Sequence, residues 1–444
     1  MINIAIIGTG YVGSVTGACL ADFGNKVICV DNDPKKINSY NQGIIPIFEP
    51  GLDDVIKRSI HSGCLEFSTN ISEAVKSSKV VFIAVGTPSL EDGNVNLSYV
   101  KSVSEIIASS MEHYTIIVNK STVPIGTAKM VKSWIREKLN SLNKTVSFDV
   151  VSNPEFLREG NAIYDFTHPD RVVLGSDSPN ALGVMKDVYH ALYLNEIPFI
   201  ETNQETAEII KYASNAFLAT KIAFINEIAN LCEKTGANVQ DVARAMGLDG
   251  RIGSKFLHPG PGYGGSCFPK DAHAIAKTAE NFGEPLTIVE TVIAANEKQK
   301  IRQAEKIEIA MGGKDSLNQK IISILGLSFK PKTDDIRESP SITIIKELVS
   351  KGAKVRVYDP AAMNNSKGQL ECIKDSVYYA IDEYDTLTGS SALVILTEWN
   401  QFSTLDLCRI YNSLKNSPYF FDLRNIYKRE EVEAAGLKYY GTGK

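Results

Sequence analysis

Short apolar runs alternate with amphipathic stretches through the first part of the chain. The opening, "NIAIIGTGYVGSVTGACLADFGNKVICVDND", has the pattern of a strand, a glycine turn, a helix and a second strand. Further apolar runs follow in "SKVVFIAVGTP", "YTIIVNKSTVP" and "FDVVSNPEF", with helical stretches such as "LSYVKSVSEIIASSM" between them. Buried strands that alternate with helices form a parallel sheet covered on both faces. The pattern therefore predicts a doubly wound α/β domain over residues 1–200.

A long helical stretch comes next. "ETAEIIKYASNAFLATKIAFINEIANLCEKTGA" contains no proline, and no glycine before Gly236, and it is apolar on more than one side. A helix with that pattern is buried between partners. We expect a central helical domain over residues 201–300, with a long connecting helix that also serves a homodimer.

The opening pattern returns in the last part of the chain. "QKIISILGLSFKPKTDDIRESPSITIIKELVSKGAKVRVYDP" again has the order strand, loop, helix and strand, and it ends in an acid, Asp359. "SSALVILTEWN" then takes the place that "SKVVFIAVGTP" has in the first half. The first loop lacks the glycine fingerprint and carries Lys330, Lys332 and Arg337 instead. The pattern predicts a second Rossmann-like domain over residues 315–444 that binds a different ligand.

The length indicates more than one domain, and the charge and the apolar runs argue against nucleic-acid binding and a membrane span. A chain of 444 residues is too long for one ordinary core. The net charge of -5 gives no global basic field for nucleic acid. No apolar run reaches the roughly 18 residues of a membrane span, and the first residues have the pattern of a strand rather than a signal peptide.

The cysteines and histidines indicate the cellular compartment and whether the protein binds a metal. The 7 cysteines are odd in number, widely spaced and without a CxxC pair, which favours reduced thiols in a cytoplasmic protein. The 6 histidines form neither HxxxH nor HExxH, so no metal site is expected.

The segment "GTGYVG" has the spacing of a dinucleotide fingerprint. Gly8 permits a tight turn, Gly10 lets the backbone approach a pyrophosphate, and Gly13 permits close packing of helix on strand. Asp31 ends the second strand about 20 residues later, where a carboxylate accepts from a ribose hydroxyl. A carboxylate repels a 2′-phosphate, so we expect NAD rather than NADP, although Lys35 and Lys36 lie nearby. The other reading is a tight turn without a ligand.

A lone thiol stands in the glycine-rich segment "PGYGGSCFPKD". A single cysteine is usually a small buried hydrophobe, and we interpret the other six that way. Cys267 differs because Gly264, Gly265 and Pro269 predict an irregular loop, with Lys270 and an acid just behind it. A thiol near cations is partly ionised and nucleophilic. The local sequence leaves a catalytic and a structural role equally open.

Lys211 lies at the head of an apolar helical face. Residues at three- and four-residue steps share that face, beginning with Asn215 and continuing through leucine, isoleucine and alanine. A lysine there points inward, and burial lowers the pKa of a lysine side chain, so that it can act as a base or as an oxyanion partner. The alternative is an ordinary solvated lysine.

Eight segments, in order, carry a resemblance to a known family. They are "GTGYVG", "VGTPS", "KSTVPIGT", "SNPEFLREG", "PDRVVLG", "KYASNAFLATKIAFINE", "HPGPGYGGSCFPKD" and "GLSFKPKTDDIRESPS". Together they resemble the UDP-glucose/GDP-mannose dehydrogenase family nearly end to end. Members that act on N-acetylated hexosamines tend to have histidine and valine-aspartate in place of "SCFPKD".

The resemblance implies an NAD-dependent, four-electron oxidation of UDP-glucose to UDP-glucuronate. Cys267 would hold the aldehyde as a thiohemiacetal, which becomes a thioester that water hydrolyses. By similarity, Lys211 and Asp271 serve base and oxyanion roles, with Asn215 helping to hold the oxyanion. Thr122 and Glu155 would position the water or relay its proton.

The resemblance also implies two sets of binding residues. The cofactor set is Gly8, Gly10, Tyr11, Val12, Gly13, Asp31, Lys36, Thr87, Pro88, Ser121, Thr122, Glu159, Lys270 and Arg337. The substrate set is Glu155, Phe156, Leu157, Glu159, Lys211, Asn215, Arg251, Phe256, Tyr263, Gly264, Lys330 and Arg424. Arg251 resembles an arginine that crosses a dimer interface to the sugar. For any one charged residue seen alone, a surface ion pair is the competing reading.

Three other functions stay open on the sequence. One is a dehydrogenase of another nucleotide sugar, GDP-mannose or a UDP-N-acetylhexosamine. Another is a two-electron hydroxyacid dehydrogenase, which has no use for Cys267. The last is a non-catalytic dinucleotide-binding regulator, which needs neither Lys211 nor Asp271. Counting the NADH formed per substrate separates the four-electron oxidation, the hydroxyacid dehydrogenase and the regulator, because they give two, one and none.

Overall fold

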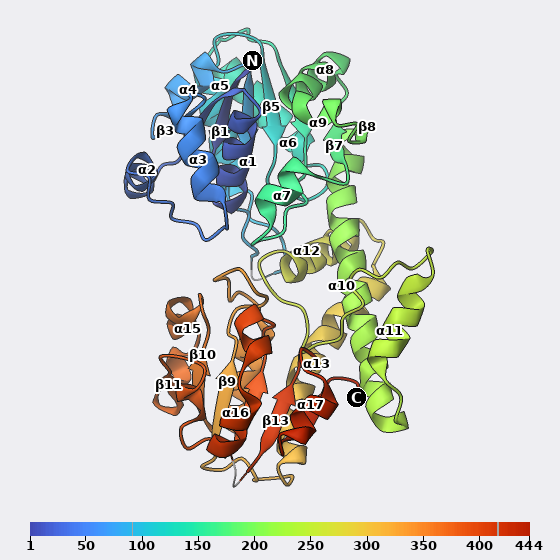
Figure 1. Ribbon diagram of the computed structural model, residues 1–444. Helices are drawn as coiled ribbons and strands as arrows, with labels where there is room; N and C mark the ends of the chain where they lie inside the picture. The colour runs from blue at the N-terminus through green and yellow to red at the C-terminus, as the bar shows by residue number, and fades with distance from the viewer. Residues whose placement is uncertain (91, 415–416) are drawn as a thin grey trace. The chain divides into compact units, whose positions relative to one another are not determined.

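The computed structural model describes residues 1–90, 92–414 and 417–444. The chain forms two compact units, each of which is described by itself. The first unit comprises residues 1–214 and 277–283, and the second comprises residues 215–276 and 284–444. Figure 1 colours the first unit mainly blue to green and the second mainly green to red. Within the described residues, no helix is long and apolar enough to cross a membrane.

An eight-stranded sheet forms the centre of the first unit. Its strand order is β3-β2-β1-β4-β5-β6-β7-β8. The strands are β1 (Asn3–Ile7), β2 (Lys26–Val30), β3 (Leu65–Ser68), β4 (Val80–Ile83), β5 (Thr115–Asn119), β6 (Phe148–Ser152), β7 (Val172–Gly175) and β8 (Phe199–Thr202). β1 pairs in parallel with both β2 and β4, so the chain reverses its direction of winding at β1. A doubly wound sheet binds its ligand at that switch point, beyond the carboxyl ends of the strands.

Helices cover both faces of this sheet. They are α1 (Tyr11–Asp22), α2 (Pro34–Asn41), α3 (Leu52–His61), α4 (Ile71–Ser77), α5 (Ser98–Ser110), α6 (Thr127–Ser141), α7 (Ala162–Thr167), α8 (Pro179–Val188) and α9 (His190–Leu194). One core packs beneath α1, α3 and α7, and a second packs beneath α4, α5 and α6. The central strands β1, β4 and β5 are buried along almost their whole length and therefore appear in the sequence as continuous apolar runs. The predicted doubly wound domain is confirmed.

The last two strands depart from the expected parallel arrangement. β7 pairs antiparallel with β6 at one position, Ser152 with Gly175, and β8 then runs parallel to β7. Doubly wound sheets often carry a reversed strand near an edge, where the direction set by the central crossovers no longer applies.

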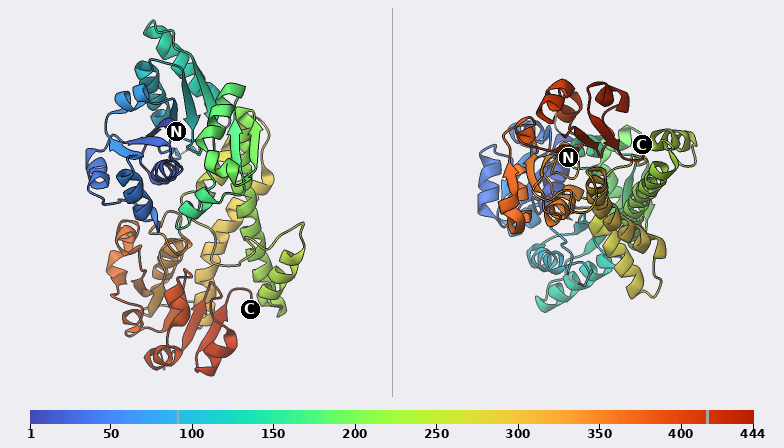
Figure 2. Two further views of the ribbon diagram at one scale, coloured as in Figure 1. Left: turned by 45° about the horizontal axis from the view of Figure 1, so that its top comes forward. Right: turned by 90° about the horizontal axis from the view of Figure 1, so that it is seen from below.

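Long helices begin the second part of the chain. α10 (Gln204–Thr235) has 32 residues and is followed by α11 (Val239–Leu248), α12 (Phe268–Asn281) and α13 (Thr287–Ala310). α10 is drawn as one unbroken helix in Figures 1 and 2. The expected long connecting helix is present, and its lack of glycine and proline explains its length.

A six-stranded sheet forms the centre of the second unit, and all its strands run parallel. Its order is β11-β10-β9-β12-β13-β14. The strands are β9 (Ile321–Leu325), β10 (Lys354–Tyr358), β11 (Val377–Tyr379), β12 (Ala392–Ile395), β13 (Tyr419–Asp422) and β14 (Lys438–Gly441). The α-helices that follow α13 are α14 (Pro340–Ser350), α15 (Met363–Gln369), α16 (Leu407–Leu414) and α17 (Arg429–Ala434). Because β9 lies between β10 and β12 as β1 lies between β2 and β4, the predicted second doubly wound domain is confirmed.

The acid after the second strand is used differently in the two sheets. Asp359, which follows β10, is buried and accepts bonds from Leu327 N–H at 2.7 Å and Ser328 N–H at 3.0 Å. The same oxygen, Oδ2, also accepts from the Ser328 hydroxyl and the Trp399 indole N–H, and Oδ1 accepts from the N–H groups of residues 361 and 362. Hydrogen bonds within the protein therefore engage both oxygens of this carboxylate.

Candidate functional site

The glycine loop between β1 and α1 shows why each glycine is needed. Gly8 has φ +101°, and a Cβ there would lie 2.6 Å from the Ala84 carbonyl oxygen. A Cβ on Gly13 would lie 1.8 Å from the Gly8 carbonyl oxygen. A Cβ on Gly10 would meet no protein atom within 4 Å. The fold excludes side chains at Gly8 and Gly13, whereas the space beside Gly10 suits the approach of a phosphate.

Asp31 lies just after β2 and is bound to the same loop. Its Oδ2 accepts from Thr9 N–H at 2.9 Å, from the Thr9 hydroxyl at 2.8 Å and from Lys36 Nζ at 3.0 Å. Burial raises the pKa of Asp31, but the bonds from Thr9 and Lys36 outweigh it and leave the pKa below its usual value. The carboxylate is therefore charged at neutral pH and can accept from a ribose hydroxyl.

The loops after β4 and β5 lie side by side. The Thr87 hydroxyl donates to the Thr122 carbonyl at 3.0 Å, and the Ser121 hydroxyl donates to the Val85 carbonyl at 2.7 Å. Both loops leave the carboxyl ends of adjacent strands. The structure therefore brings together Thr87, Ser121 and Thr122 at the edge of the sheet where α/β proteins bind ligands.

A buried ion pair joins α10 to the loop after β6. Lys211 Nζ lies 3.0 Å from Glu155 Oε1, and the two side chains are 4% and 6% exposed. Burial raises the pKa of Glu155, but Lys211 and the Leu157 N–H outweigh it and lower that pKa below its usual range. The Phe156 ring lies 5.4 Å from Lys211 Nζ. The inward orientation expected for Lys211 is thus seen in its burial.

Two buried charged residues of this unit were not singled out from the sequence. Glu49, between α2 and α3, accepts from the Tyr11 hydroxyl and from Gly160 N–H. Lys120 donates to Asn153 Oδ1 at 3.1 Å and to the Tyr189 hydroxyl at 3.2 Å, and burial lowers its pKa to about 8. Their partners are distant in sequence, so no local pattern marks them, although "KSTVP" already contained Lys120.

In the second unit, polar side chains gather at the start of α12. Asn215, on α10, donates to Asp271 Oδ2 at 2.7 Å, and Lys270 Nζ donates to Asp271 Oδ1 at 2.8 Å. The Asp271 N–H donates to the Cys267 carbonyl at 2.8 Å, which fixes the Cys267 backbone at the N-terminus of α12. Cys267 is partly exposed, and its Sγ lies 3.5 Å from the Ser266 hydroxyl. The positive end of a helix dipole favours negative charge at that position.

The cysteine loop packs tightly against the loop after β9. A Cβ on Gly264 would lie 2.3 Å from the Glu338 carbonyl oxygen, and one on Gly265 would lie 2.7 Å from the Phe329 ring. The Gly265 N–H donates to the Arg337 carbonyl at 2.8 Å. The glycines before Cys267 are therefore required by contact with the segment that carries Lys330 and Arg337.

Buried amides on the long helices α10 and α13 also hold the same loop. Asn296 Oδ1 accepts from Tyr263 N–H at 2.8 Å, and its Nδ2 donates to the Tyr263 carbonyl at 3.1 Å. Asn226 accepts from Gly260 N–H at 2.8 Å. The Phe268 ring contacts the rings of Tyr263 and Phe256. Backbone polar groups of the loop are thereby satisfied without regular secondary structure.

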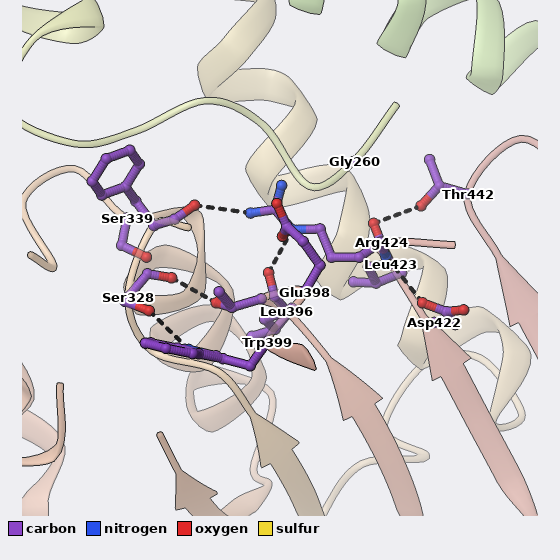
Figure 3. Close-up of polar contacts among 12 residues, drawn as sticks. Gly260, Ser328, Ser339, Leu396, Glu398, Trp399, Asp422, Leu423, Arg424 and Thr442 are labelled. Carbon is purple, nitrogen blue, oxygen red and sulfur yellow. Dashed lines mark hydrogen bonds and ion pairs between the residues drawn. The ribbon is translucent and has the colours of Figure 1, made fainter. Parts of the chain in front are cut away.

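The three arginines of the predicted sites have protein partners. Arg424 donates to the Leu396 carbonyl at 2.7 Å and to the Phe329 carbonyl at 3.1 Å, and pairs with Glu398 (Figure 3). Arg337 is exposed and makes a two-bonded pair with Asp335. Arg251, 90% exposed, pairs with Asp249. Arg424 thus fixes the residue before Lys330, whose Nζ lies 5.3 Å from the Phe329 ring.

Each unit assembles part of the predicted set. The first holds the glycine loop, Asp31, the loops after β4 and β5, and the Glu155–Lys211 pair. The second holds Asn215, Cys267, Asp271 and the loops around Tyr263 and Lys330. Among the described residues, no group of three or more histidine, cysteine, aspartate or glutamate side chains could hold a metal ion.

Family comparisons match almost the whole chain. The NAD binding domain of the UDP-glucose/GDP-mannose dehydrogenase family matches residues 2–193, the central domain residues 205–298 and the UDP binding domain residues 323–429. The chain belongs to the UDP-glucose/GDP-mannose dehydrogenase family. This family member is an oxidoreductase, and its cofactor is NAD.

Individual relatives of this dehydrogenase are similar over their full length. A UDP-glucose 6-dehydrogenase of Rhizobium meliloti (strain 1021) is 51% identical over 100% of this chain and 99% of its own. The UDP-glucose 6-dehydrogenase TuaD of Bacillus subtilis (strain 168) is 45% identical over 100% of this chain and 94% of its own. The solved structure of a UDP-glucose dehydrogenase from Pyrobaculum islandicum is 36% identical, with a TM-score of 0.90, over 100% of this chain and 98% of its own.

Proposed function

We propose that this dehydrogenase oxidises UDP-glucose to UDP-glucuronate at Cys267, with the expected site residues in the roles given below. The observation that carries the substrate is the full-length identity of 51% to a UDP-glucose 6-dehydrogenase. The UDP binding domain of the family matches residues 323–429 and supports a UDP-sugar as the ligand of the second unit.

Two oxidations at one carbon explain the need for a thiol. NAD, held by the glycine loop and Asp31, would supply the hydride acceptor for C6 of the sugar in each oxidation. After the first, Cys267 Sγ adds to the aldehyde carbon, and the carbonyl oxygen takes a proton to give a thiohemiacetal. Loss of the second hydride from that carbon, and of the hydroxyl proton, leaves a thioester. Water then adds to the thioester and releases the carboxylate and the Cys267 thiol.

Lys211, Asn215 and Asp271 serve the oxygen at the reacting carbon. Lys211 and Asn215 are one turn apart on α10, so they project from the same face of that helix. The amide and the ammonium donate hydrogen bonds to an oxyanion, and Asp271, hydrogen-bonded to Asn215, orients the amide. In the first oxidation the proton goes to Asp271, or to Lys211 in its neutral amine form.

Glu155 and Thr122 serve the hydrolytic step. Glu155 remains ionised because Lys211 lowers its pKa, so it can accept a proton from water. Thr122, on the loop after β5, supplies a hydroxyl that orients the water. This assignment gives the two members of the buried pair different tasks, with Lys211 at the oxyanion and Glu155 at the nucleophilic water.

The remaining predicted residues hold the two ligands. Lys330 suits the phosphates of UDP as a point charge, and Arg424 and the loop around Tyr263 complete that side. Glu159 and the segment from Phe156 contact the sugar nucleotide from the first unit. The glycine loop, Asp31, Lys36 and the loops after β4 and β5 hold NAD.

A homodimer and a cytoplasmic location complete the proposal. Phe217, Phe224 and Leu231 follow one another at seven-residue steps on α10 and are 65%, 46% and 57% exposed. Such a stripe on a long helix suits a second copy of the chain, and Arg251 would then reach the partner's sugar. We expect light scattering to show a dimer, and Phe224→Asp to give monomers. All seven cysteines are thiols, which suits a reducing compartment.

The test of the proposal is Cys267→Ala, measured as NADH formed per UDP-glucose. Wild type should form two, and the variant should lose turnover while its affinity for both ligands changes little. Cys267→Ser should accumulate an ester detectable as added mass on the intact protein, because an ester hydrolyses more slowly than a thioester. Production of two NADH by the alanine variant would refute the role of the thiol. Faster turnover of GDP-mannose than of UDP-glucose would show that GDP-mannose is the substrate instead.

A further inference from the structure

Glu49 lies on the loop between α2 and α3 and is buried, with 7% of its surface exposed. Its Oε2 accepts from the Tyr11 hydroxyl and, at 2.6 Å, from the Gly160 N–H. Its Oε1 accepts from the Ala162 N–H at 2.7 Å. One carboxylate thus receives three hydrogen bonds from two segments that are remote in sequence.

Both segments belong to the proposed ligand sites. Tyr11 opens α1 within the glycine fingerprint. Gly160 follows Glu159 at the end of the loop that begins after β6. The Tyr11 hydroxyl also accepts from the Gly160 N–H at 3.2 Å, which joins the two loops directly. Glu49 therefore contacts the expected cofactor loop and the expected substrate loop together.

The three donors demand a carboxylate at this position. Burial and the bond to Glu49 raise the pKa of Tyr11 far above its ordinary value, so the phenol keeps its proton and donates. Two backbone N–H groups can only donate. An amide in place of the carboxylate would turn its own N–H group toward at least one of these donors, and that donor would then be buried without an acceptor.

We propose that Glu49 is a positioning residue, which sets the loop of residues 153–161 against the glycine loop so that both ligands are bound in register. Glu155 holds the start of this loop through Leu157 N–H at 2.6 Å, and Glu49 holds its end. This inference rests on the proposed ligand roles of the two loops. It predicts that a residue that touches neither ligand controls the affinity for both.

The experiment compares Glu49→Gln with Glu66→Gln, an exposed glutamate on β3 of the same unit. NADH absorbance gives kcat and both KM values, and NADH fluorescence titration gives dinucleotide affinity without turnover. We expect Glu49→Gln to raise the KM for NAD and for UDP-glucose by about tenfold or more, the scale of one lost charged hydrogen bond. The kcat should fall less, and Glu66→Gln should match wild type.

Tyr11→Phe provides a milder test that removes one hydroxyl. It should raise the KM for UDP-glucose about threefold or more, although Tyr11 belongs to the cofactor loop. Because Tyr11 and Glu49 share one hydrogen bond, the double variant should show less than the product of the two single effects.

A lower melting temperature with unchanged KM values in Glu49→Gln and Tyr11→Phe would show a structural role only and overturn the inference. A wild type that forms no NADH from UDP-glucose would instead refute the proposed function, and the NADH titration of the same variants would still decide the inference.

Discussion

Removing one member of the Lys211–Glu155 pair should destabilise the first unit strongly. The side chains are almost fully buried, with Nζ and Oε1 3.0 Å apart. At an effective dielectric constant of about 20, opposite charges at that distance attract by roughly 5 kcal/mol, which desolvation of both groups largely offsets. Glu155→Gln removes the charge that Glu155 places beside the buried ammonium, so we expect a loss of about 3–5 kcal/mol.

The pair of variants Glu155→Gln and Lys211→Met separates charge pairing from general disruption. In the double variant neither member of the pair remains without the other, so its loss should be smaller than the sum of the single losses by about 2 kcal/mol. The exposed pair Lys57–Asp53, on α3, is the control, and Lys57→Met should change stability by less than about 0.5 kcal/mol.

The chain offers a direct assay for the first unit. Its two tryptophans lie one in each unit, Trp134 on α6 and Trp399 after β12. In a Trp399→Phe background, urea unfolding followed by fluorescence reports on the unit that contains the pair. Additive single losses, or losses below about 1 kcal/mol, would contradict the reasoning from a buried ion pair.

The same pair gives a pH dependence with a definite sign. The folded pKa of Glu155 lies below its ordinary value of 4.5, so the unfolded chain takes up the proton first as the pH falls. The stabilisation from Glu155 is therefore complete above pH 4.5 and is lost as the pH falls toward the folded pKa. Glu155→Gln should lose less stability than wild type over that acidic window, and an equal loss would refute the assignment.

Three further predictions follow from the ligand loops. Gly13→Ala should lower the melting temperature sharply because its Cβ would overlap the Gly8 carbonyl, whereas Gly10→Ala should keep wild-type stability and weaken NAD binding; equal melting curves would count against the packing argument. Asp31→Ala should raise the KM for NAD more than that for UDP-glucose, and wild type should prefer NAD to NADP in initial rates; comparable efficiency with NADP would refute the role of Asp31. Lys330→Ala should raise the KM for UDP-glucose and leave that for NAD unchanged, and the reverse pattern would show that the two sheets are assigned to the wrong ligands.

Local stereochemistry made the fold predictable. The glycine spacing, the apolar runs and the acid after the second strand all depend on residues that are neighbours in sequence, and each sheet places them as expected. The reversed β7 follows from no local pattern, because strand direction at a sheet edge depends on where the chain arrives after α7. A single pair, Ser152 with Gly175, joins it to β6.

The site residues also divide into those that the local sequence predicts and those that depend on long-range contacts. Burial of Lys211 followed from the helical face it shares with Asn215. Glu49 could not be found in this way, because its partners at residues 160 and 162 lie more than 100 residues away. The sequence also could not show that the Arg424 guanidinium donates hydrogen bonds to the carbonyls of residues 329 and 396. Long-range hydrogen bonds are decided by the assembled fold.

The occupied acid in the second sheet has a consequence for the order of events in a catalytic cycle. Both strand-ending acids lie within the described part of the chain. Asp359 accepts from six backbone and side-chain groups, whereas Asp31 is the acid that we expect to bind a ribose. The two sheets share one topology, but we expect a dinucleotide at the first sheet rather than at the second. In the proposed four-electron oxidation, two hydride transfers would use this one site, so NADH would dissociate and a second NAD would bind between them. In the proposed reaction the sugar has to stay bound through this exchange, and a covalent bond to Cys267 would hold it in place while the cofactor is replaced.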